Sequence, residues 1–284
     1  MVAALWGGTF VAGRVLAQSL PLMTAAFSRF LIASVLLVAF TIKVEGRIPK
    51  LSREQVFLTF ALGFTGIFLY NIFFFSALAS VPAGRTSLFV SLTPTVTAIL
   101  AGIFFRERLD LSRWLGVVLA LLGAVIVVTR GDLIEGITDI SRALGPGELM
   151  MLGAVLSWAA YTLISRKALE SLSPMVATTY GTLWGFAFLS LSAIGEIDKI
   201  EWSQLDGPVW ISIIYLGALG TFVGFIWYYE GIKAIGPSRT AVFTNLVPVF
   251  GVMISAIVLG EEVLISMIFG GLIAIYGVSL VNRK

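Results

Sequence analysis

The chain has 284 residues, 58% of them hydrophobic and only 12% charged, with a mean hydropathy of +0.99 and a net charge of +3. Because soluble proteins carry about 25% charged residues, this composition indicates an integral membrane protein, and cations confined to loops between apolar runs are no sign of nucleic acid binding. The sequence contains no cysteine and no histidine, which excludes disulfides, thiolate chemistry and Cys/His metal sites.

Apolar runs of membrane length recur along the whole chain. A run of roughly 18 apolar residues is enough to cross a bilayer as a helix. The predicted spans are 2–18, 22–42, 55–79, 84–105, 112–129, 147–165, 174–195, 208–232, 238–259 and 264–281. We therefore expect an all-α integral membrane protein with ten transmembrane helices.

The loop charges predict an orientation. An even number of spans places both termini on one side of the membrane. With cytoplasmic termini, thirteen lysines and arginines lie in inside segments and five in outside segments, as the positive-inside rule requires. We predict a multi-pass protein of the cell (inner) membrane with both termini in the cytoplasm.

The second half of the chain repeats the first. Residues 62–127 align without a gap on residues 216–281, with 17 identities in 66 positions. We predict a single transmembrane domain, residues 1–284, made of two repeats, 1–145 and 146–284. Each repeat holds five spans, an odd number, so the second must insert upside down relative to the first. Secondary transporters are commonly built this way, with the substrate site near the midplane between the halves.

The first and third spans of each repeat carry aromatic residues that suit a cavity for an apolar or aromatic side chain. The predicted substrate-binding residues in these spans are Trp6, Tyr70, Asn71, Trp158, Tyr161, Trp227 and Tyr228. The alternative is the interfacial belt, where Trp and Tyr gather at headgroup depth. The choice stays open for Trp6 and Trp158, whereas the mid-span position of Tyr70 favours the cavity.

The fourth span contains a segment, Arg85 to Pro94, that recurs in the ninth span as Arg239 to Pro248. Because proline has no N–H, the carbonyls of Val90 and Thr244 lose their helical partners, and in lipid they must find another donor. The predicted binding residues beside the prolines are Ser87, Ser91, Pro94, Thr244, Asn245 and Pro248. We expect a polar stripe whose free carbonyls accept hydrogen bonds from a substrate ammonium. The alternative is a packing kink in which Ser and Thr bond their own backbone.

Arg85 and Arg239 open these two spans, one near each membrane surface. A long cationic side chain at a helix end reaches the headgroups at modest cost. The alternative is that each arginine ties neighbouring helix ends together as part of a gate on its side. Glu107 and Glu261 end the same helices, where we expect them to anchor loops. The absence of a midplane charge argues against strongly anionic substrates, and the absence of a midplane carboxylate argues against a cationic-drug pump.

The fifth and tenth spans share a stripe of small residues, four and then three positions apart. Its members are Gly116, Ala120, Gly123, Gly270, Ala274 and Gly277. Small residues let helix backbones approach closely. We therefore expect these two spans to pack on each other around the pseudo-two-fold axis.

The whole pattern resembles the drug/metabolite transporter superfamily, specifically the ten-helix EamA-type exporters. The resemblance rests on the paired Arg-Thr…Pro segments, on Glu107 and Glu261, and on the glycine pairs of the fifth and tenth spans. It implies two inverted five-helix bundles that export amino acids or related metabolites, with aromatic or other neutral amino acids nearest by analogy. The small-residue stripe is similar to the dimer helix of the half-size small multidrug resistance proteins. Arg106 stands before Glu107 where glycine is commoner in the family.

The missing motifs narrow the function further. The sequence has no Gly-x-x-x-x-Gly-Lys-Ser/Thr loop for ATP and no recognisable catalytic motif, so we predict a transporter and not an enzyme, without metal or cofactor. We expect a protein that works as a monomer in the lipid bilayer and exports small neutral or zwitterionic metabolites by alternating access. A multidrug or nucleotide-sugar/sugar-phosphate type carrier, a channel-like facilitator and a membrane scaffold or regulator remain the alternatives.

Overall fold

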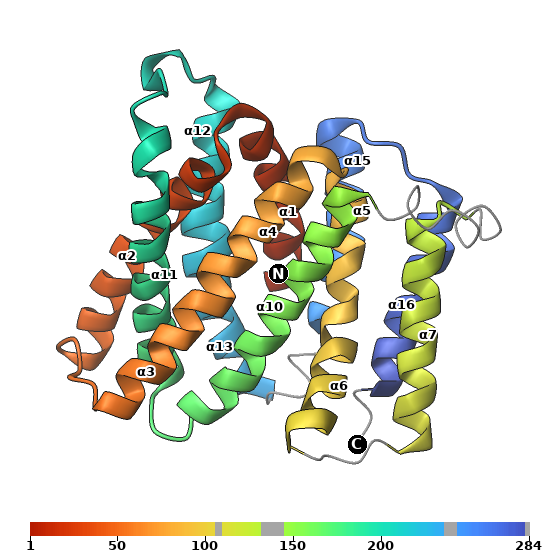
Figure 1. The fold of residues 1–284 in the computed structure, drawn as a ribbon, viewed down its shortest axis with the longest axis horizontal. Coiled ribbons are helices and arrows are strands. Elements are labelled where there is room, and N and C mark those ends of the chain that lie inside the picture. The colour runs from red at the N-terminus through yellow and green to blue at the C-terminus, as the bar shows by residue number, and fades with distance from the viewer. Residues whose placement is uncertain (106–109, 132–144, 236–242, 282–284) are drawn as a thin grey trace.

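The computed structural model describes residues 1–105, 110–131, 145–235 and 243–281, and within these ranges it contains helices and turns but no strand. Helices and their helical π and 3-10 segments (η) follow one another along the chain (Figure 1). Their bounds are α1 (Val2–Ser19), α2 (Leu22–Glu45), α3 (Arg53–Leu62), η1 (Gly63–Leu69), α4 (Tyr70–Ser80), α5 (Ala83–Phe89), η2 (Val90–Leu92), α6 (Thr93–Phe105), α7 (Leu111–Val128), α10 (Pro146–Ala168), α11 (Pro174–Ile197), η3 (Trp202–Gln204), α12 (Gly207–Ile214), η4 (Tyr215–Val223), α13 (Gly224–Ile235), α15 (Val247–Leu259) and α16 (Ile265–Val281).

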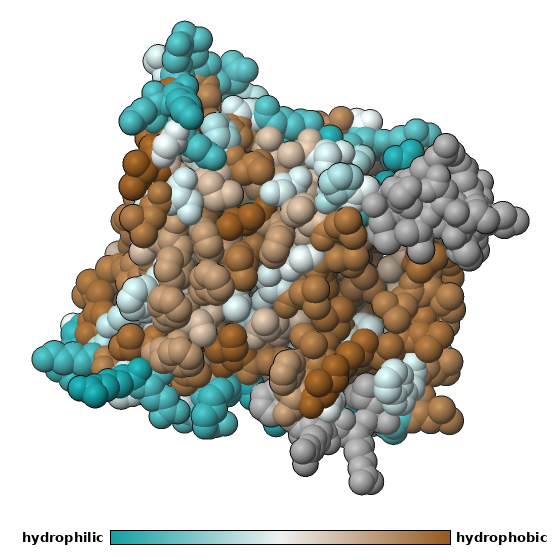
Figure 2. Space-filling view, viewed as in Figure 1, coloured by the Kyte–Doolittle hydropathy of each residue, from teal (hydrophilic) through white to brown (hydrophobic). Residues whose placement is uncertain are grey.

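The predicted fold class, an all-α integral membrane protein, is confirmed. All predicted spans except the one at 238–259 coincide with helices along their length. The span predicted at 238–259 is described only from Phe243 onward, because residues 236–242 lie outside the described part. Among the described residues, five helical segments are long and apolar enough to cross a membrane, and three shorter apolar helices accompany them. Figure 2 shows the corresponding apolar band between two polar ends of the molecule.

Local sequence signals set several helix ends. Ser52 caps α3 through a capping box with Gln55, and the hydroxyl of Ser173 accepts a hydrogen bond from the backbone of Val176 at the start of α11. Such side chains satisfy backbone N–H groups that have no partner inside the helix. Gly46 ends α2 and Gly260 ends α15 in the left-handed conformation, which glycine adopts without a steric penalty.

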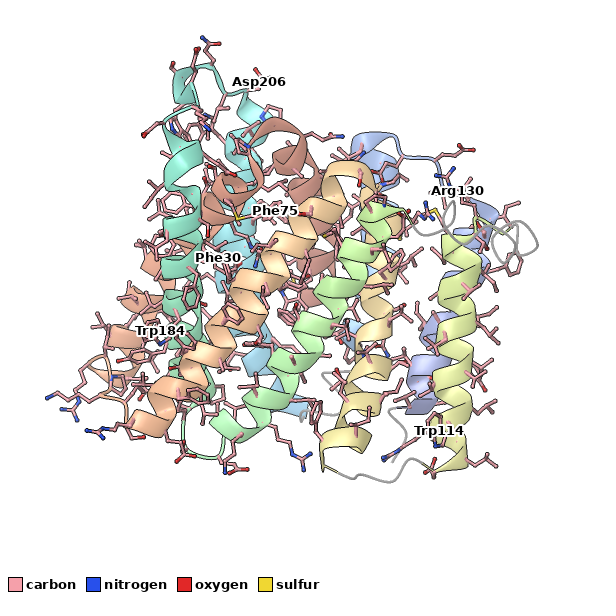
Figure 3. All side chains as sticks on the ribbon, viewed as in Figure 1. Phe30, Phe75, Trp114, Arg130, Trp184 and Asp206 are labelled. Carbon is pink, nitrogen blue, oxygen red and sulfur yellow. The ribbon has the colours of Figure 1, made fainter. Side chains whose placement is uncertain are left out.

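Corresponding helices of the two halves run in opposite directions. In Figure 3, Trp114 and Arg130 lie at opposite ends of α7, with Trp114 at the bottom. Helix α16, the counterpart of α7, descends beside it toward the C-terminus, which Figure 1 places at the bottom. The inverted arrangement of five-helix repeats predicted from the odd number of spans is therefore present. The exact repeat boundaries stay a prediction.

The two halves interleave and do not simply sit side by side. Helix α1 packs against α15, α12 and η4 of the second half, while α10 packs against α4, η1 and α6 of the first half. Phe30, Phe74 and Phe75 are fully buried at the centre of the resulting core, and Figure 3 shows Phe30 and Phe75 in the middle of the bundle. Any site between the halves is thus built from both.

Candidate functional site

The third and eighth spans each contain a π-helical segment at matching positions, η1 and η4. Glycines allow both segments to touch a neighbouring backbone. A Cβ added at Gly63 would lie 2.5 Å from the carbonyl oxygen of Gly181, and one added at Gly217 would lie 2.7 Å from that of Arg29. Isolated π-segments inside α-helices occur frequently at functional sites. The glycines of these spans were the sequence signal for this feature, which the sequence analysis missed.

One aromatic cluster lies beside η1 and combines residues from both halves. The ring of Trp158 on α10 lies 5.1 Å from that of Tyr70 on α4 and 5.1 Å from that of Tyr161. Tyr161 covers Gly66 so closely that a Cβ there would meet its ring at 2.2 Å. The structure thus brings together three predicted binding residues at the level of the π-helix.

A second aromatic cluster occupies the related position beside η4. The ring of Trp6 on α1 lies 5.4 Å from that of Tyr228 and 6.1 Å from that of Phe225, both on α13. The indole N–H of Trp6 donates a 3.0 Å hydrogen bond to the carbonyl of Gly220 in η4. The predicted binding residue Trp227 lies on a different face of α13 from Phe225 and Tyr228. It therefore does not join this cluster and is 40% exposed.

The predicted break at Pro94 is present, but its carbonyl is not free. Helix α5 passes into the 3-10 segment η2, and the N–H of Thr93 donates to the carbonyl of Val90. The tighter 3-10 turn therefore supplies the hydrogen bond that proline removes. The prediction that the carbonyl of Val90 is free to accept a hydrogen bond from a substrate ammonium is therefore wrong.

The polar stripe of the fourth span is buried and mostly bonded to its own helix. Ser87 donates to the carbonyl of Gly84 at 2.7 Å, and Ser91 donates to that of Leu88 at 2.6 Å. Ser87 also lies 3.4 Å from the carbonyl of Pro248 in α15. These contacts match the packing alternative more closely than an open polar cavity.

The ninth span breaks at the matching place. Asn245 and Leu246 form a turn before α15, whose first turn contains the buried Pro248. Thr244 and Asn245 are half-buried at this break. Within the described part of the chain, the side chain of Asn245 makes no hydrogen bond. A role for it in binding stays a prediction.

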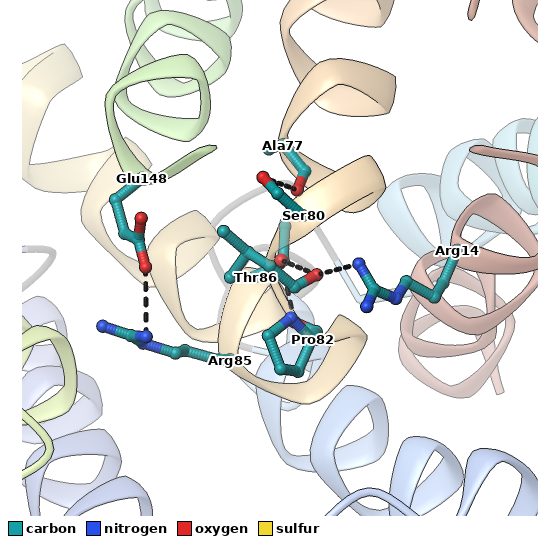
Figure 4. Close-up of polar contacts among 8 residues, drawn as sticks. Arg14, Ala77, Ser80, Pro82, Arg85, Thr86 and Glu148 are labelled. Atoms are coloured by element: carbon teal, nitrogen blue, oxygen red, sulfur yellow. Dashed lines mark hydrogen bonds and ion pairs between the residues drawn. The ribbon is translucent and has the colours of Figure 1, made fainter. Parts of the chain in front are cut away.

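The arginine that opens the fourth span makes a buried ion pair. Nη1 of Arg85 lies 3.0 Å from Oε1 of Glu148 at the start of α10, with side chains 8% and 10% exposed, as Figure 4 shows. Close by, Arg14 of α1 donates to the carbonyl of Val81 at 3.0 Å and to that of Leu78. The ion pair joins helix ends of the two halves, whereas the contacts of Arg14 join α1 to the end of α4 within the first half. A gating role for Arg85 stays a prediction. Arg239 and Glu107 lie outside the described residues.

Glu261 acts at the same end of the molecule. Its carboxylate accepts hydrogen bonds from the backbone N–H groups of Ala83 at 2.8 Å and Gly84 at 2.9 Å, so it caps the fourth span. A cavity of about 310 Å³ opens beside it, lined by Pro82, Arg85, Arg130, Glu261, Glu262, Leu264 and Met267. None of the predicted substrate-binding residues lines this cavity.

Helices α7 and α16 pack through the predicted stripe of small residues. A Cβ added at Gly116 would lie 2.6 Å from the carbonyl oxygen of Gly277, and one added at Gly123 would lie 2.4 Å from that of Gly270. Ala120 and Ala274 are buried in the same contact. Since Gly116 and Gly123 correspond to Gly270 and Gly277 in the repeat, the contacts are reciprocal, as a two-fold axis requires.

The structure also brings a charge that was not predicted there to the centre of the bundle. Arg29 on α2 donates from Nε to Oγ1 of Thr221 at 3.1 Å and from Nη1 to Oδ1 of Asn71 at 3.2 Å. Both partners are buried and lie deep in their spans. The expectation that no charge lies near the midplane is therefore wrong, because a long side chain carries the guanidinium inward from α2. The absence of a midplane charge can therefore no longer be used to exclude anionic groups in the substrate.

Comparison with known proteins places the chain among membrane transporters. It is 30% identical over 258 residues to the "Uncharacterized transporter YyaM" of Bacillus subtilis (strain 168), an alignment that covers 91% of this chain and 83% of that protein. It is 28% identical over 288 residues to the "Probable amino-acid metabolite efflux pump" of Salmonella typhimurium (strain LT2), covering 98% of this chain and 91% of the relative. It is 23% identical over 279 residues to the "Probable terminal-alkyne amino-acid exporter" of Streptantibioticus cattleyicolor, covering 98% and 90%.

The fold has a solved counterpart. A crystal structure aligns with a TM-score of 0.66 at 19% identity, covering 98% of this chain and 93% of the other, and this likeness concerns the fold alone. The model of the EamA-like transporter family matches residues 1–129 and again residues 145–283. Family and relatives both indicate a transporter and not an enzyme. The chain is a multi-pass membrane protein that belongs to the EamA-like transporter family.

Proposed function

We propose that the protein is a secondary transporter that exports small neutral or zwitterionic metabolites, above all amino acids with apolar or aromatic side chains. The observation that carries this proposal is the pair of aromatic clusters, one beside each π-helix. In each cluster a tryptophan from the first helix of one half, Trp6 or Trp158, packs on a tyrosine from the other half. Aromatic walls with a few polar groups are typical of sites for apolar ligands.

The mechanism follows from the interleaved halves. Because each cluster contains residues of both halves, relative movement of the halves changes both clusters together. The breaks before Pro94 and Pro248 give the fourth and ninth spans a place to bend. Alternating exposure of one central site to the two membrane surfaces is the behaviour that inverted repeats support.

The names of two relatives support the choice of substrate. One is described as an amino-acid metabolite efflux pump and the other as a terminal-alkyne amino-acid exporter. We further propose that the protein acts as a monomer in the cell (inner) membrane with both termini in the cytoplasm. The excess of cations in the inside segments supports this orientation.

Counterflow in proteoliposomes tests the proposal. Vesicles loaded with unlabelled phenylalanine are expected to accumulate labelled phenylalanine transiently and saturably, whereas a channel gives neither saturation nor counterflow. A cationic dye and a nucleotide sugar, each tested with and without a pH gradient, represent the rival carriers. Transport of either compound in preference to phenylalanine and leucine contradicts the proposal, and absence of any flux favours a scaffold or regulator.

Two substitutions at the helix breaks test the mechanism. We expect Pro94→Ala and Asn245→Ala to lower the rate of phenylalanine counterflow by about 10-fold, since a helix without its break bends less easily and a lost polar contact weakens binding. Pro208→Ala, at the first turn of α12, and Gln204→Ala, on the exposed segment η3, are the matched controls. Wild-type rates in both break variants would contradict the role of these residues.

A further inference from the structure

Arg29 carries its charge unusually deep into the bundle. Its partner Thr221 lies at the middle of the eighth span, fourteen residues from Gly207 and fourteen from Ile235, or roughly 20 Å from either end at 1.5 Å per residue. Its other partner, Asn71, lies within the third span next to Tyr70. An ionisable side chain at membrane depth is costly and generally marks a functional site.

Both hydrogen-bond acceptors of Arg29 are held by the π-helices. The amide nitrogen of Asn71 donates to the carbonyl of Ile67 in η1 at 2.6 Å, which turns Oδ1 toward Arg29. The hydroxyl of Thr221 donates to the carbonyl of Leu216 in η4 at 2.8 Å, so its oxygen is left to accept from Arg29. The guanidinium thus lies between Asn71, just after η1 in the first half, and Thr221 in η4 of the second half.

The charge of Arg29 is not balanced by these contacts. Asn71 and Thr221 are neutral, and the guanidinium lies 5.1 Å from the ring centroid of Phe30. Among the described residues, no carboxylate oxygen lies within the 4.0 Å of an ion pair from the Arg29 guanidinium. A buried cation whose partners are neutral gains strongly from an anionic ligand.

The guanidinium also has donors to spare. Of its five N–H groups, two are used in the contacts with Thr221 and Asn71. Within the described part of the chain, Nη2 makes no hydrogen bond. The side chain as a whole is half-buried although both partners are buried. A guanidinium with unused N–H groups can bind a carboxylate through two parallel hydrogen bonds.

We propose that Arg29 binds the carboxylate of the transported molecule and thereby selects amino acids and related carboxylates over amines. This inference rests on the proposed function as an amino-acid exporter. Tyr70, next to Asn71, belongs to the cluster with Trp158, which places an aromatic wall beside the cation. The substrate's carboxylate pairs with Arg29 while its apolar side chain lies against these rings.

Three aromatic compounds separate the contributions of the two charged groups. Phenylalanine carries a carboxylate and an ammonium, 3-phenylpropionate only the carboxylate, and phenethylamine only the ammonium. Labelled forms of all three are measured for binding to purified protein and for counterflow in proteoliposomes. Wild-type protein is expected to bind and carry phenylalanine, to bind 3-phenylpropionate, and to discriminate against phenethylamine.

Substitution of Arg29 is expected to change this preference and not merely the activity. In Arg29→Gln, binding of both carboxylates should weaken by about 10-fold or more, the usual effect of losing a charge-assisted hydrogen bond, while binding of phenethylamine stays equal or rises. Arg29→Lys restores the charge without the planar fork, so it should recover part of the preference for carboxylates. A purely structural role predicts equal losses for all three compounds and no recovery with lysine.

A matched control keeps folding and recognition apart. Arg14→Gln removes an arginine whose donors bind the carbonyls of Leu78 and Val81 at the end of α4, and we expect it to affect stability without altering the order of preference. If Arg29→Gln does not fold, Arg29→Lys still tests the inference. Its preference for carboxylates over phenethylamine is expected to be weaker than that of wild type but still measurable.

The outcomes distinguish this inference from the proposed function. If wild type carries phenylalanine and Arg29→Gln carries it at the same rate, the inference fails and the proposed function stands. An unchanged preference in Arg29→Lys when Arg29→Gln cannot be purified overturns it as well. If wild type neither binds nor carries either carboxylate, both fail together. Preference of wild type for phenethylamine also overturns both and supports a carrier of cations.

Discussion

Arg85 and Arg29 both lie in membrane-spanning helices, and their surroundings differ in one decisive respect. Arg85, at the end of the fourth span, is paired with the carboxylate of Glu148 at 3.0 Å. Arg29, at the centre, is held by the neutral side chains of Thr221 and Asn71. A paired charge joins helices, whereas a charge held only by neutral groups favours an anionic ligand. Arg85 thus belongs to a structural contact at one end of the molecule, and Arg29 to the central region where we propose that the substrate binds.

The repeat sharpens this contrast. Gly63 packs on the backbone of Gly181 just as Gly217 packs on that of Arg29, so Gly181 is the structural counterpart of Arg29. The counterparts of Thr221 and Asn71 in the aligned repeats are Ile67 and Phe225. The scaffold is duplicated, but the polar cluster is present on one side only. An asymmetric substrate needs such an asymmetric site.

The largest expected effect tests the paired arginine. We expect Glu148→Gln to lower the free energy of unfolding by about 3 kcal/mol, because it removes the carboxylate that pairs with a buried charge. Thermal melting of the purified protein in detergent measures this change. Glu170→Gln is the matched control, since its ion pair with Lys167 is 60% and 57% exposed and contributes little. Equal melting temperatures for wild type and Glu148→Gln would contradict this contrast. They would mean that the carboxylate of Glu148 does not stabilise the buried charge of Arg85.

An intermediate effect is expected at the same end. Glu261→Gln should destabilise the protein by about 1–2 kcal/mol, because the amide keeps one acceptor oxygen for the N–H groups of Ala83 and Gly84 but loses the second acceptor and the charge. Its neighbour Glu262 is exposed, so Glu262→Gln should melt like wild type. A shift of the same size in both variants would show that net charge, and not the cap, is responsible.

The smallest expected effect compares the two aromatic clusters at the centre. Trp6→Phe should cost about 1 kcal/mol of stability, because the carbonyl of Gly220 loses its donor. Trp158→Phe should cost less, since its indole N–H has no hydrogen-bond partner among the described residues. Melting curves of the two variants, recorded side by side, give the difference. Identical shifts would indicate that stacking, which the clusters share, outweighs the hydrogen bond.

Much of the fold could be predicted from the sequence. The apolar runs located the transmembrane helices to within a few residues, as for α1, predicted at 2–18 and found at Val2–Ser19. The odd number of spans in each repeat predicted the inversion. The repeated glycines of the fifth and tenth spans predicted the contact that Gly116 makes with Gly277. Each of these features depends on composition, length or spacing, which a single chain displays directly.

The details of the candidate site were harder to predict. Proline at position 94 correctly indicated a break, but the 3-10 turn that satisfies the carbonyl of Val90 depends on how the backbone adjusts around it. Trp6 and Trp158 could not be told apart from interfacial residues until the interleaving of the halves placed them on Tyr228 and Tyr70. The π-helices were not predicted, because they need the close approach of a neighbouring backbone.

The sequence by itself determined the class of protein, the number and position of its spans, the inverted repeat and the pairing of its small-residue helices. These follow from the cost of placing polar groups and backbone in lipid, which every segment meets on its own. Only the tertiary structure decided which charge lies at the centre. Arg29 reaches the centre because Asn71 and Thr221, 150 positions apart in the chain, come together beside it in the folded protein.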